Sequence, residues 1–465
     1  MVQNENKDIL SNLPDDILVS ILLRIDMNDA TRSSILSRRW RYLSPYSYFT
    51  TLDFDASKAF PVECKGRHHI SFKNVKPRFM NWVNQVVISH RAQFINDFRI
   101  CFPLSQAYSD CICIWIELAI SKRVKNLELD FSGNGFIECH ESHLPQYSLP
   151  SNVFKGSPYY ENDISYLTSL RLTCVDVSGE LLELLLARCH LLERLYVEHS
   201  MNLLDLKIVN LSGMLRYLSI HKCLNLKELE IHAANLVSFE FTSYHQSVNV
   251  VYTRVPSLVE AKFRWRYFSG LSPYMSQIEC FSAQLTKLSL DVDMIREYLF
   301  VPSFLNVKYL ELRATLSFPT NLLPLRYFAE ACPLLHHFNL QVLWMPRNGI
   351  EQFDSESESD SELEEEEYSL EDVKHWLEEQ EEGFIATLPY LRKLEWTEAF
   401  SLPGQFEYEL ALYLVKNAVL LEKFICSPRT PHAPKNLAPT EEEAPRQRAR
   451  RLAMVIPPHV HFVIM

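Results

Sequence analysis

Glycine is scarce in this sequence, with ten glycines among 465 residues, about a third of the roughly 7% that is usual. Folds built on glycine-rich segments, such as collagen-like chains and phosphate-binding loops, are therefore not favoured. The pair Gly133-x-Gly135 lacks the third glycine and the following helix of a dinucleotide-binding motif. The signatures of common hydrolases, zinc proteases and nucleotide-binding loops do not occur either. We therefore expect neither catalysis nor a cofactor.

Long apolar runs are also missing. No run reaches the 18 residues of a transmembrane helix, and the densest, Leu181–Ala187, is far shorter. The first 13 residues are polar and have no basic stretch followed by an apolar one, so no secretory signal is expected. These features predict no membrane association.

The cysteines do not form a recognisable framework. Their number, eleven, is odd, no C-x-x-C pair occurs, and most lie inside apolar patterns. Cys139, His140 and His143 are close together but lack a fourth ligand, so a loop is favoured over a metal site. The pattern predicts reduced thiols in a protein of the nucleus or cytoplasm and no bound metal.

The charge is concentrated in one segment. The chain carries 46 basic and 58 acidic residues, a net charge of −12, and residues 351–382 hold 16 Asp and Glu but only Lys374 as a base. The remainder, with 45 basic and 42 acidic residues, carries about +3. Without a broad basic excess, nucleic-acid binding is not favoured. Residues 351–368 are predicted to form a disordered acidic insert.

The N-terminal region has a compact helical pattern. Leu13-Pro14-Asp15-Asp16 is typical of a helix start, since proline suits the first helical position and acidic residues suit the positive end of the helix dipole. Apolar residues follow at helical spacing, and two further short helices are predicted after Asp29 and Ser37. About 40 residues cannot bury a good core alone. The apolar face therefore either forms an ordinary helical core or docks on another protein, and we favour docking.

A six-residue pattern, apolar-x-x-apolar-x-apolar, recurs along the rest of the chain. Most successive starts lie 20–29 residues apart, the spacing of leucine-rich repeats. Two steps, of 11 and 10 residues, predict tight returns without helices or two strands sharing one coil. The pattern occurs at Val124–Leu129, Leu167–Leu172, Leu192–Val197, Leu215–Ile220, Leu226–Ile231, Leu236–Phe241, Leu258–Phe263, Leu285–Leu290, Val307–Leu312, Leu335–Leu340, Leu391–Trp396 and Leu421–Cys426.

Alternation within each hexamer predicts a short strand that points two apolar side chains into a solenoid core. Stacked repeats would then form a parallel sheet on one side. Residues at helical spacing predict helices around residues 79–87, 112–120, 181–189, 325–332 and 406–414.

Residues 8–43 resemble the F-box motif, in the Leu13-Pro14 start, the apolar face from Ile17 to Leu22 and the Ser37-Arg38-Arg39-Trp40 block. With the repeats, the chain is similar to plant F-box/leucine-rich-repeat (FBD-like) proteins. The resemblance implies a non-catalytic substrate-recognition subunit of an SCF-type ubiquitin ligase. Its F-box would bind a Skp-type adaptor and through it a cullin, and its repeats would bind a target protein. The alternative is a repeat scaffold that acts outside a ubiquitin ligase.

The resemblance also suggests the organisation of the chain. We expect an α/β protein with a three-helix F-box at residues 8–48 and an irregular leucine-rich-repeat solenoid at 49–350, with a parallel sheet on one side. The acidic insert, C-terminal FBD-like repeats at 369–427 and a Pro-rich basic tail at 428–465, with a possible final strand, would follow.

Two sets of contact residues are predicted. The adaptor is expected to contact Leu13, Pro14, Ile17, Leu18, Ile21, Leu22 and Trp40. The target is expected to contact outward strand positions, namely Arg171, Arg194, Tyr196, Tyr217, Lys287, Tyr309, His337 and Lys393. The segment Arg264-Trp265-Arg266-Tyr267-Phe268 could be a binding hot spot or, as we favour, a strand or turn with aromatic residues packed inward.

Overall fold

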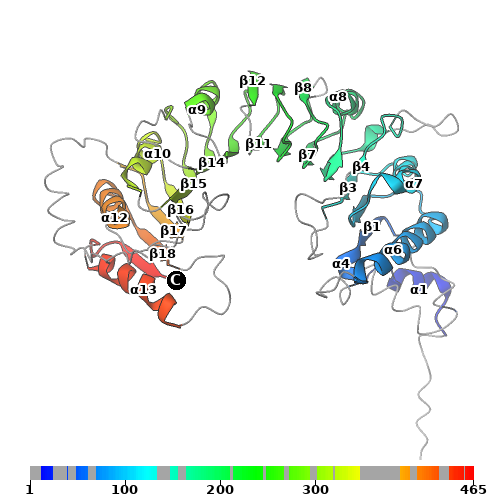
Figure 1. Ribbon diagram of the computed structural model, residues 1–465, viewed down its shortest axis with the longest axis horizontal. Helices are drawn as coiled ribbons and strands as arrows, with labels where there is room; N and C mark the ends of the chain where they lie inside the picture. The colour runs from blue at the N-terminus through cyan, green and yellow to red at the C-terminus, as the bar shows by residue number, and fades with distance from the viewer. Residues whose placement is uncertain are drawn as a thin grey trace, which may run out of the picture. The chain divides into compact units, whose positions relative to one another are not determined.

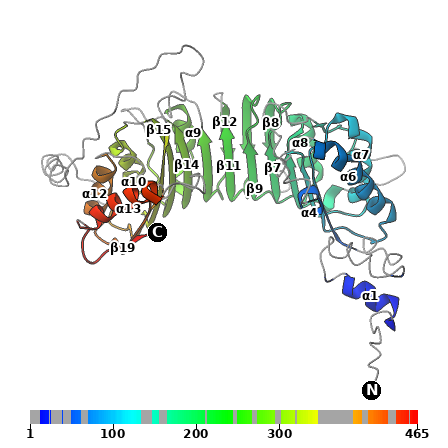
Figure 2. The ribbon, with the colours of Figure 1, turned by 60° about the horizontal axis from the view of Figure 1, so that its bottom comes forward.

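The computed structural model describes residues 12–22, 24, 39, 49–60, 70–132, 147–154, 164–209, 213–243, 248–265, 272–293, 301–317, 320–345, 388–397, 406–428, 439–454 and 456–465. The chain divides into two compact units, residues 1–233 and 234–465. Figures 1 and 2 draw the helices and strands of both, coloured from blue at the N-terminus to red at the C-terminus. Among the described residues, no helix is both long and apolar enough to cross a bilayer.

The described part of the F-box region is the helix α1 (Asp15–Leu22). It begins directly after Pro14 and carries Asp15 and Asp16 in its first turn, as its sequence predicts. The guanidinium of Arg39 pairs with Asp15 at 2.5 Å and donates to the Leu13 carbonyl oxygen at 2.6 Å. The expected second and third helices lie outside the described residues, apart from Arg39.

The sheet of the first unit consists of parallel strands that follow one another in chain order. They are β1 (Thr51–Asp55), β2 (Asp97–Cys101), β3 (Asn126–Asp130), β5 (Ser169–Thr173), β7 (Arg194–Glu198) and β9 (Tyr217–His221). The connecting segments contain α4 (Ala56–Ala59), α6 (Ile70–Ser89), η3 (Gln106–Tyr108), α7 (Ser109–Ser121), η5 (Ile164–Tyr166) and α8 (Gly179–Arg188). Two short strands, β4 (Tyr147–Ser148) and β6 (Val175–Asp176), pair separately.

The core of this unit is built from the second and fourth residues of each strand. The second residues are Leu52, Phe98, Leu127, Leu170, Leu195 and Leu218, and the fourth are Phe54, Ile100, Leu129, Leu172, Val197 and Ile220. Each is exposed by 2% or less. Such complete burial of Leu, Ile or Phe is worth about 1.5–3 kcal/mol per side chain. Stacking therefore stabilises each repeat through its neighbours.

The two short repeat steps have a structural cause. Strands β8 (Asp205–Val209) and β10 (Glu228–His232) pair with each other in parallel, separately from β7 and β9. The first residues of β7 and β9, at 194 and 217, and those of β8 and β10, at 205 and 228, are both 23 residues apart. Each of these coils thus holds two strands, which was one of the two predicted explanations.

The second unit repeats the arrangement. Its parallel strands are β11 (Ser238–Ser243), β13 (Glu260–Trp265), β14 (Lys287–Asp293), β15 (Tyr309–Ser317), β16 (His337–Met345), β17 (Lys393–Thr397), β18 (Lys423–Ser427) and β19 (His461–Ile464). It also contains β12 (Asn249–Arg254), α9 (Ser272–Glu279), η6 (Ser282–Gln284), η7 (Leu323–Leu325), α10 (Arg326–Glu330), α12 (Phe406–Asn417) and α13 (Pro439–Ala453).

The small residue Ala261 occupies a core position where the other hexamers have larger side chains. Its register neighbour on β11 is Phe239, and its neighbour on β14 is Leu288. The Phe239 ring lies 5.8 Å from the Phe263 ring in an edge-on arrangement. The adjacent aromatic side chains thus occupy volume that a larger residue at position 261 would take, as dense packing requires.

The predicted α/β fold with a parallel sheet is confirmed, and each of the twelve hexamers contains a strand. The five expected helices correspond to α6, α7, α8, α10 and α12. Strands β2, β4, β6, β8 and β12 and helices α4, α9 and α13 were not predicted from the sequence, and β19 lies where a final strand was considered possible. The acidic insert lies outside the described residues.

None of the nine cysteines in the described residues takes part in a disulfide. Burial raises the pKa of the Cys101, Cys223 and Cys426 thiols to about 12. These thiols are therefore protonated near neutral pH and poorly nucleophilic. Cys426 acts as a small apolar residue in the core, whereas Cys101, at an outward strand position, donates to Asp130.

Candidate functional site

The predicted adaptor-contact residues differ in accessibility along α1. Pro14 and Ile17 are exposed, and Leu13 and Ile21 are half-buried. Leu18 and Leu22 are buried against the protein's own chain. The side chains available to a partner are therefore those of Leu13, Pro14, Ile17 and Ile21. Trp40 lies outside the described residues.

The predicted target-contact residues lie on the outward face of the parallel sheet within each unit. In every strand the first, third and fifth residues point outward, and the register aligns them into three rows. The first row contains Arg194, Tyr217, Lys287, Tyr309, His337 and Lys393, and the second contains Arg171 and Tyr196. Their outward placement was inferred from alternation alone.

In the first unit, each predicted arginine lies opposite a tyrosine of the next strand. Arg171 on β5 faces Tyr196 on β7, and its guanidinium carbon lies 3.8 Å from the ring centroid. Arg194 on β7 faces Tyr217 on β9 at 5.5 Å. Cation–π contacts of this kind orient the guanidinium while leaving its N–H edge available.

Glu198 supports this arrangement from the third row. It accepts a hydrogen bond from the Tyr196 hydroxyl and lies 3.6 Å from the Lys222 ammonium. The ring of Tyr196 also lies 5.4 Å from that of His221. Tyr196 is thereby fixed between Arg171 and His221, so that the ring presents a defined surface.

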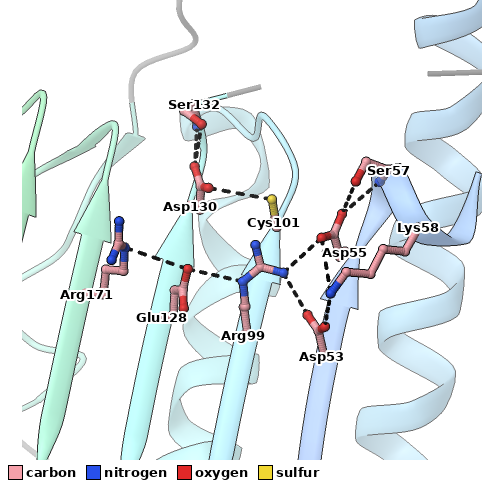
Figure 3. A network of polar contacts seen from close by, with 10 residues as sticks. All are labelled: Asp53, Asp55, Ser57, Lys58, Arg99, Cys101, Glu128, Asp130, Ser132 and Arg171. Atoms are coloured by element: carbon pink, nitrogen blue, oxygen red, sulfur yellow. Dashed lines mark hydrogen bonds and ion pairs between the residues drawn. The ribbon is translucent and has the colours of Figure 1, made fainter. Parts of the chain in front are cut away.

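An acidic network covers the other end of the same unit, on β1, β2 and β3 (Figure 3). The Arg99 guanidinium contacts Asp53 at 2.9 Å, Asp55 at 3.0 Å and Glu128 at 3.1 Å. Burial disfavours ionisation of Asp55, but hydrogen bonds from Ser57 and Arg99 outweigh it and hold its pKa below the ordinary value. This network was not predicted from the sequence, because it depends on which residues the register brings side by side.

In the second unit, the predicted residues form a row of interacting side chains. Glu260 pairs with Lys287 at 2.6 Å, and the Lys287 ammonium lies 5.5 Å from the Tyr309 ring centroid. The rings of Tyr309 and His337 meet edge-on with centroids 4.7 Å apart. The hydrogen bond to Glu260 raises the pKa of Lys287 above its usual value. The positive charge of Lys287 is thus already neutralised by Glu260.

His337 continues the row toward β17. Its Nε2 lies 3.3 Å from Glu395, which also pairs with Lys393. Burial lowers the pKa of His337 and outweighs the attraction of Glu395. Burial opposes ionisation of Glu395, but its bonds to Lys393 and His337 lower its pKa overall. His337 is therefore biased toward the neutral form.

The candidate hot spot at Arg264–Phe268 is described only at its start. Arg264 lies outward on β13 with its Nε 2.9 Å from the buried Asp291, which also lies 3.9 Å from Arg313. Tyr267 and Phe268 lie outside the described residues, so the choice between the two interpretations of this segment stays a prediction.

Within the described part of the chain, no group of three or more His, Cys, Asp and Glu residues is arranged to hold a metal ion. Cys139, His140 and His143 lie outside it.

A family model described as "At1g61320/AtMIF1, LRR domain" matches residues 98–376, more than half of the chain. The chain belongs to this leucine-rich-repeat family. An F-box domain model matches residues 10–51, which include α1, the half-buried Leu13 and the exposed Pro14 and Ile17. The leucine-rich-repeat match includes β2 through β16 and hence most of the outward rows described above. The predicted resemblance to F-box/leucine-rich-repeat proteins is thus confirmed.

Curated relatives of this leucine-rich-repeat chain come from Arabidopsis thaliana. The Putative F-box/LRR-repeat protein At5g54820 is 32% identical over 32% of this chain and 31% of the relative. The F-box/FBD/LRR-repeat protein At1g13570 is 28% identical over 42% of this chain and 45% of the relative. The Putative F-box protein At3g29830 is 28% identical over 53% and 55%, respectively. The chain thus spans between about a third and about half the length of these relatives.

Proposed function

We propose that this protein is a non-catalytic substrate-recognition subunit of an SCF-type ubiquitin ligase. Its F-box would dock on a Skp-type adaptor, and through it on a cullin, while the outward face of its repeats would bind a target for ubiquitination. We further propose that it acts in the nucleus or cytoplasm, without nucleic acid or membrane as a partner. The observation that carries the proposal is one chain with an F-box match and an ordered leucine-rich-repeat sheet.

The accessibility of α1 supports the docking part of the proposal. Ile17 is 46% exposed although it is a large apolar residue at the start of a helix. Together with Leu13 and Pro14 it provides apolar surface that the described chain leaves uncovered. Large apolar side chains are the usual anchors of protein interfaces when a partner buries them.

The docking test is a pull-down of a Skp-type adaptor with the full chain and its Leu13→Ala/Pro14→Ala variant. Truncation of a leucine that is buried costs about 2–5 kcal/mol, so we expect adaptor affinity to fall at least tenfold. Ser20→Ala, an exposed substitution on the same helix, is the matched control and should bind as the natural chain does. Unchanged adaptor binding by the folded double variant would contradict the assignment.

The alternative function, a repeat scaffold outside a ubiquitin ligase, makes a different prediction for the assembled complex. A ligase subunit should co-purify with a cullin in an adaptor-dependent manner, and its target should accumulate when the proteasome is inhibited. A scaffold would retain the adaptor but fail both tests. Performing them with the Leu13→Ala/Pro14→Ala variant as the reference separates adaptor-dependent partners from the rest.

A further inference from the structure

We propose that the outward face of β5, β7 and β9 binds an acidic, extended segment of a protein partner, whose carboxylates contact the guanidinium groups of Arg171 and Arg194. The inference rests on the proposed function, since it names the chemistry of the partner that the repeats would take. It deepens that function by assigning the contact to one part of one unit.

The two arginines are oriented before any partner arrives. Each guanidinium stacks on the tyrosine directly opposite it in the register, at 3.8 Å for Arg171 and 5.5 Å for Arg194. Stacking limits the rotamers of the side chain while leaving the N–H groups at its edge able to bind a carboxylate in a bidentate manner. Less side-chain entropy is then lost on binding than for a free surface arginine.

Neither arginine is fully neutralised by its surroundings. Among the described residues, the Arg194 guanidinium takes part in no ion pair, and its contact is the ring of Tyr217. The Arg171 Nε lies 3.8 Å from Glu128, whose carboxylate is closer to Arg99, at 3.1 Å. Glu198, the acidic residue of the same strands, is occupied by Lys222 and the Tyr196 hydroxyl.

The charge of the face changes sign along the first unit. The outward positions of β5, β7 and β9 contain Arg171, Arg194 and Glu198, a net charge of +1. Those of β1, β2 and β3 contain one base and five acids, a net charge of −4: Arg99, and Asp53, Asp55, Asp97, Glu128 and Asp130. An acidic segment is therefore attracted to β5–β9 and repelled from β1–β3, which fixes where it binds.

The spacing of the two arginines fits an extended peptide. They lie on neighbouring strands and are offset by two residues in the register, since Arg194 is opposite Ser169 and Arg171 is opposite Tyr196. With a strand spacing of about 4.8 Å and a rise of about 3.3 Å per residue, their backbone positions are about 8 Å apart. Carboxylates two residues apart in an extended segment are about 7 Å apart. The alternation acid-x-acid thus matches the pair.

The chemistry argues against nucleic acid as the occupant. Nucleic-acid binding depends on many phosphate contacts across a broadly basic surface, whereas this face has two arginines beside an acidic network. Tyr217, 42% exposed, instead offers a ring against which the side chains between the two carboxylates can pack.

The test uses the full chain and fluorescein-labelled peptides of twelve residues in which Glu alternates with Ser. A peptide with Gln for every Glu is the neutral control, and one with phosphoserine for Ser and Gln for Glu tests phosphate as the recognised group. Fluorescence anisotropy at low and at high salt gives the affinities. We expect the Glu peptide to bind at least fivefold more tightly than the Gln peptide at low salt, with the difference reduced at high salt.

The variants locate the site. Arg171→Glu/Arg194→Glu should weaken binding of the Glu peptide about tenfold, because each arginine loses an attraction and gains a repulsion. Lys262→Glu/Lys423→Glu, a matched double reversal on outward strand positions of the second unit, should change it less than twofold. Circular dichroism confirms that both variants are folded.

Three outcomes would overturn the inference: no preference for Glu over Gln, a preference for the phosphorylated peptide alone, or equal weakening by both double variants. The proposed function is tested separately, by adaptor and cullin co-purification. A chain that passes those tests but shows no charge preference retains its function and loses only the chemistry proposed here.

Discussion

The first outward row is built differently in the two units, although the sequence signal is the same. In the first unit Ser169, Arg194 and Tyr217 lie side by side on consecutive strands, and in the second unit Glu260, Lys287 and Tyr309 do so. Both rows place a cation over the next tyrosine. The preceding strand supplies a serine in one case and a carboxylate in the other. The residue one repeat earlier therefore decides whether the cation remains available to a partner.

The first unit contains one very close contact between a helix and a neighbouring strand. At Gly179 in the first unit, an added Cβ would lie 1.9 Å from the backbone oxygen of Asp205. This glycine begins α8, and its lack of a side chain lets the helix approach the start of β8. Because the obstacle is backbone rather than a flexible side chain, even alanine requires a shift of the coil.

The largest predicted effect is the loss of stability in the first unit when this close contact at Gly179 is overfilled. Gly179→Ala should destabilise the first unit by about 3 kcal/mol, because it overpacks the junction of α8 and β8. Denaturant unfolding followed by hydrogen exchange should show lost protection in the first unit with the second unit retained. Glu180→Ala, at the exposed next position, is the control and should change stability by less than about 0.5 kcal/mol. Equal loss of protection in both units would contradict the prediction.

A second variant perturbs the face of the second unit alone. Asp291 is buried and lies 2.9 Å from Arg264 and 3.9 Å from Arg313. Asp291→Asn should lower the free energy of unfolding by about 2 kcal/mol, because it leaves the Arg264 guanidinium without a counter-ion in a poorly solvated place. The comparable change in the first unit, Glu128→Gln, removes a more exposed charge and should cost under about 1 kcal/mol. Denaturation midpoints of the two variants measure the contrast.

The pH dependence offers a smaller effect in the second unit. The pKa of His337 is below its ordinary value of 6.5, because burial outweighs Glu395, while Lys393 also disfavours protonation. The unfolded chain then binds a proton more readily than the folded one, so stability should fall as the pH drops below about 6.5. His337→Gln should remove this part of the slope between pH 7 and pH 5, as measured by thermal unfolding. A slope unchanged by the substitution would show that His337 does not contribute.

The smallest predicted effect comes from exchanging Ser169 and Glu260, the residues that distinguish the first outward rows of the two units. Ser169→Glu should form a surface ion pair with Arg194 and stabilise the first unit by about 0.2–1 kcal/mol, and Glu260→Ser should remove a similar amount from the second. Double-mutant cycles with Arg194→Ala and Lys287→Ala isolate each pair. Coupling of the expected sign in both cycles would establish that the preceding strand sets the availability of the cation.

Much of the fold follows from local sequence patterns. The hexamer places two apolar residues on one face of a short strand. Neighbouring repeats in the stack bury that face. All twelve strands were therefore predictable. Strands β2 and β8 follow the same pattern, with Ile95, Phe98 and Ile100 in one and Leu203, Leu206 and Ile208 in the other. Both fit the hexamer as fully as the twelve recognised ones do, so these two strands were equally predictable.

Other elements depend on tertiary contacts. The helix α13 contains Pro445 and was expected to be a Pro-rich tail. Its buried residues Ala449 and Leu452, together with the Tyr408 hydroxyl that donates to the Arg448 carbonyl oxygen at 2.9 Å, stabilise it against that local preference. Strand β12 lacks the apolar spacing of the hexamer, but the ring of its Tyr252 packs edge-on against the rings of Phe239 and Phe281.

The sequence predicted which side chains of the candidate site point outward, but not which neighbouring side chains they contact. Alternation places Arg171 and Lys287 outward, because every second side chain of a strand leaves the core. Whether each meets a ring or a carboxylate depends on the register with strands 20–30 residues away in sequence. Coil lengths vary too much along this chain for that register to be derived from spacing. The network around Arg99 was therefore invisible in the sequence, although each of its members was an outward residue.

Because the register is constant within each unit, the outward side-chain positions are evenly spaced and structurally equivalent from strand to strand. A side chain moves sideways by about 4.8 Å when it is exchanged between equivalent positions of neighbouring strands, and by about 6.6 Å when it moves two residues along one strand. Both steps leave the core positions unaltered. Point substitutions can thus translate a recognition element across the surface in fixed increments, so that duplicated genes could diverge in partner without redesigning the scaffold.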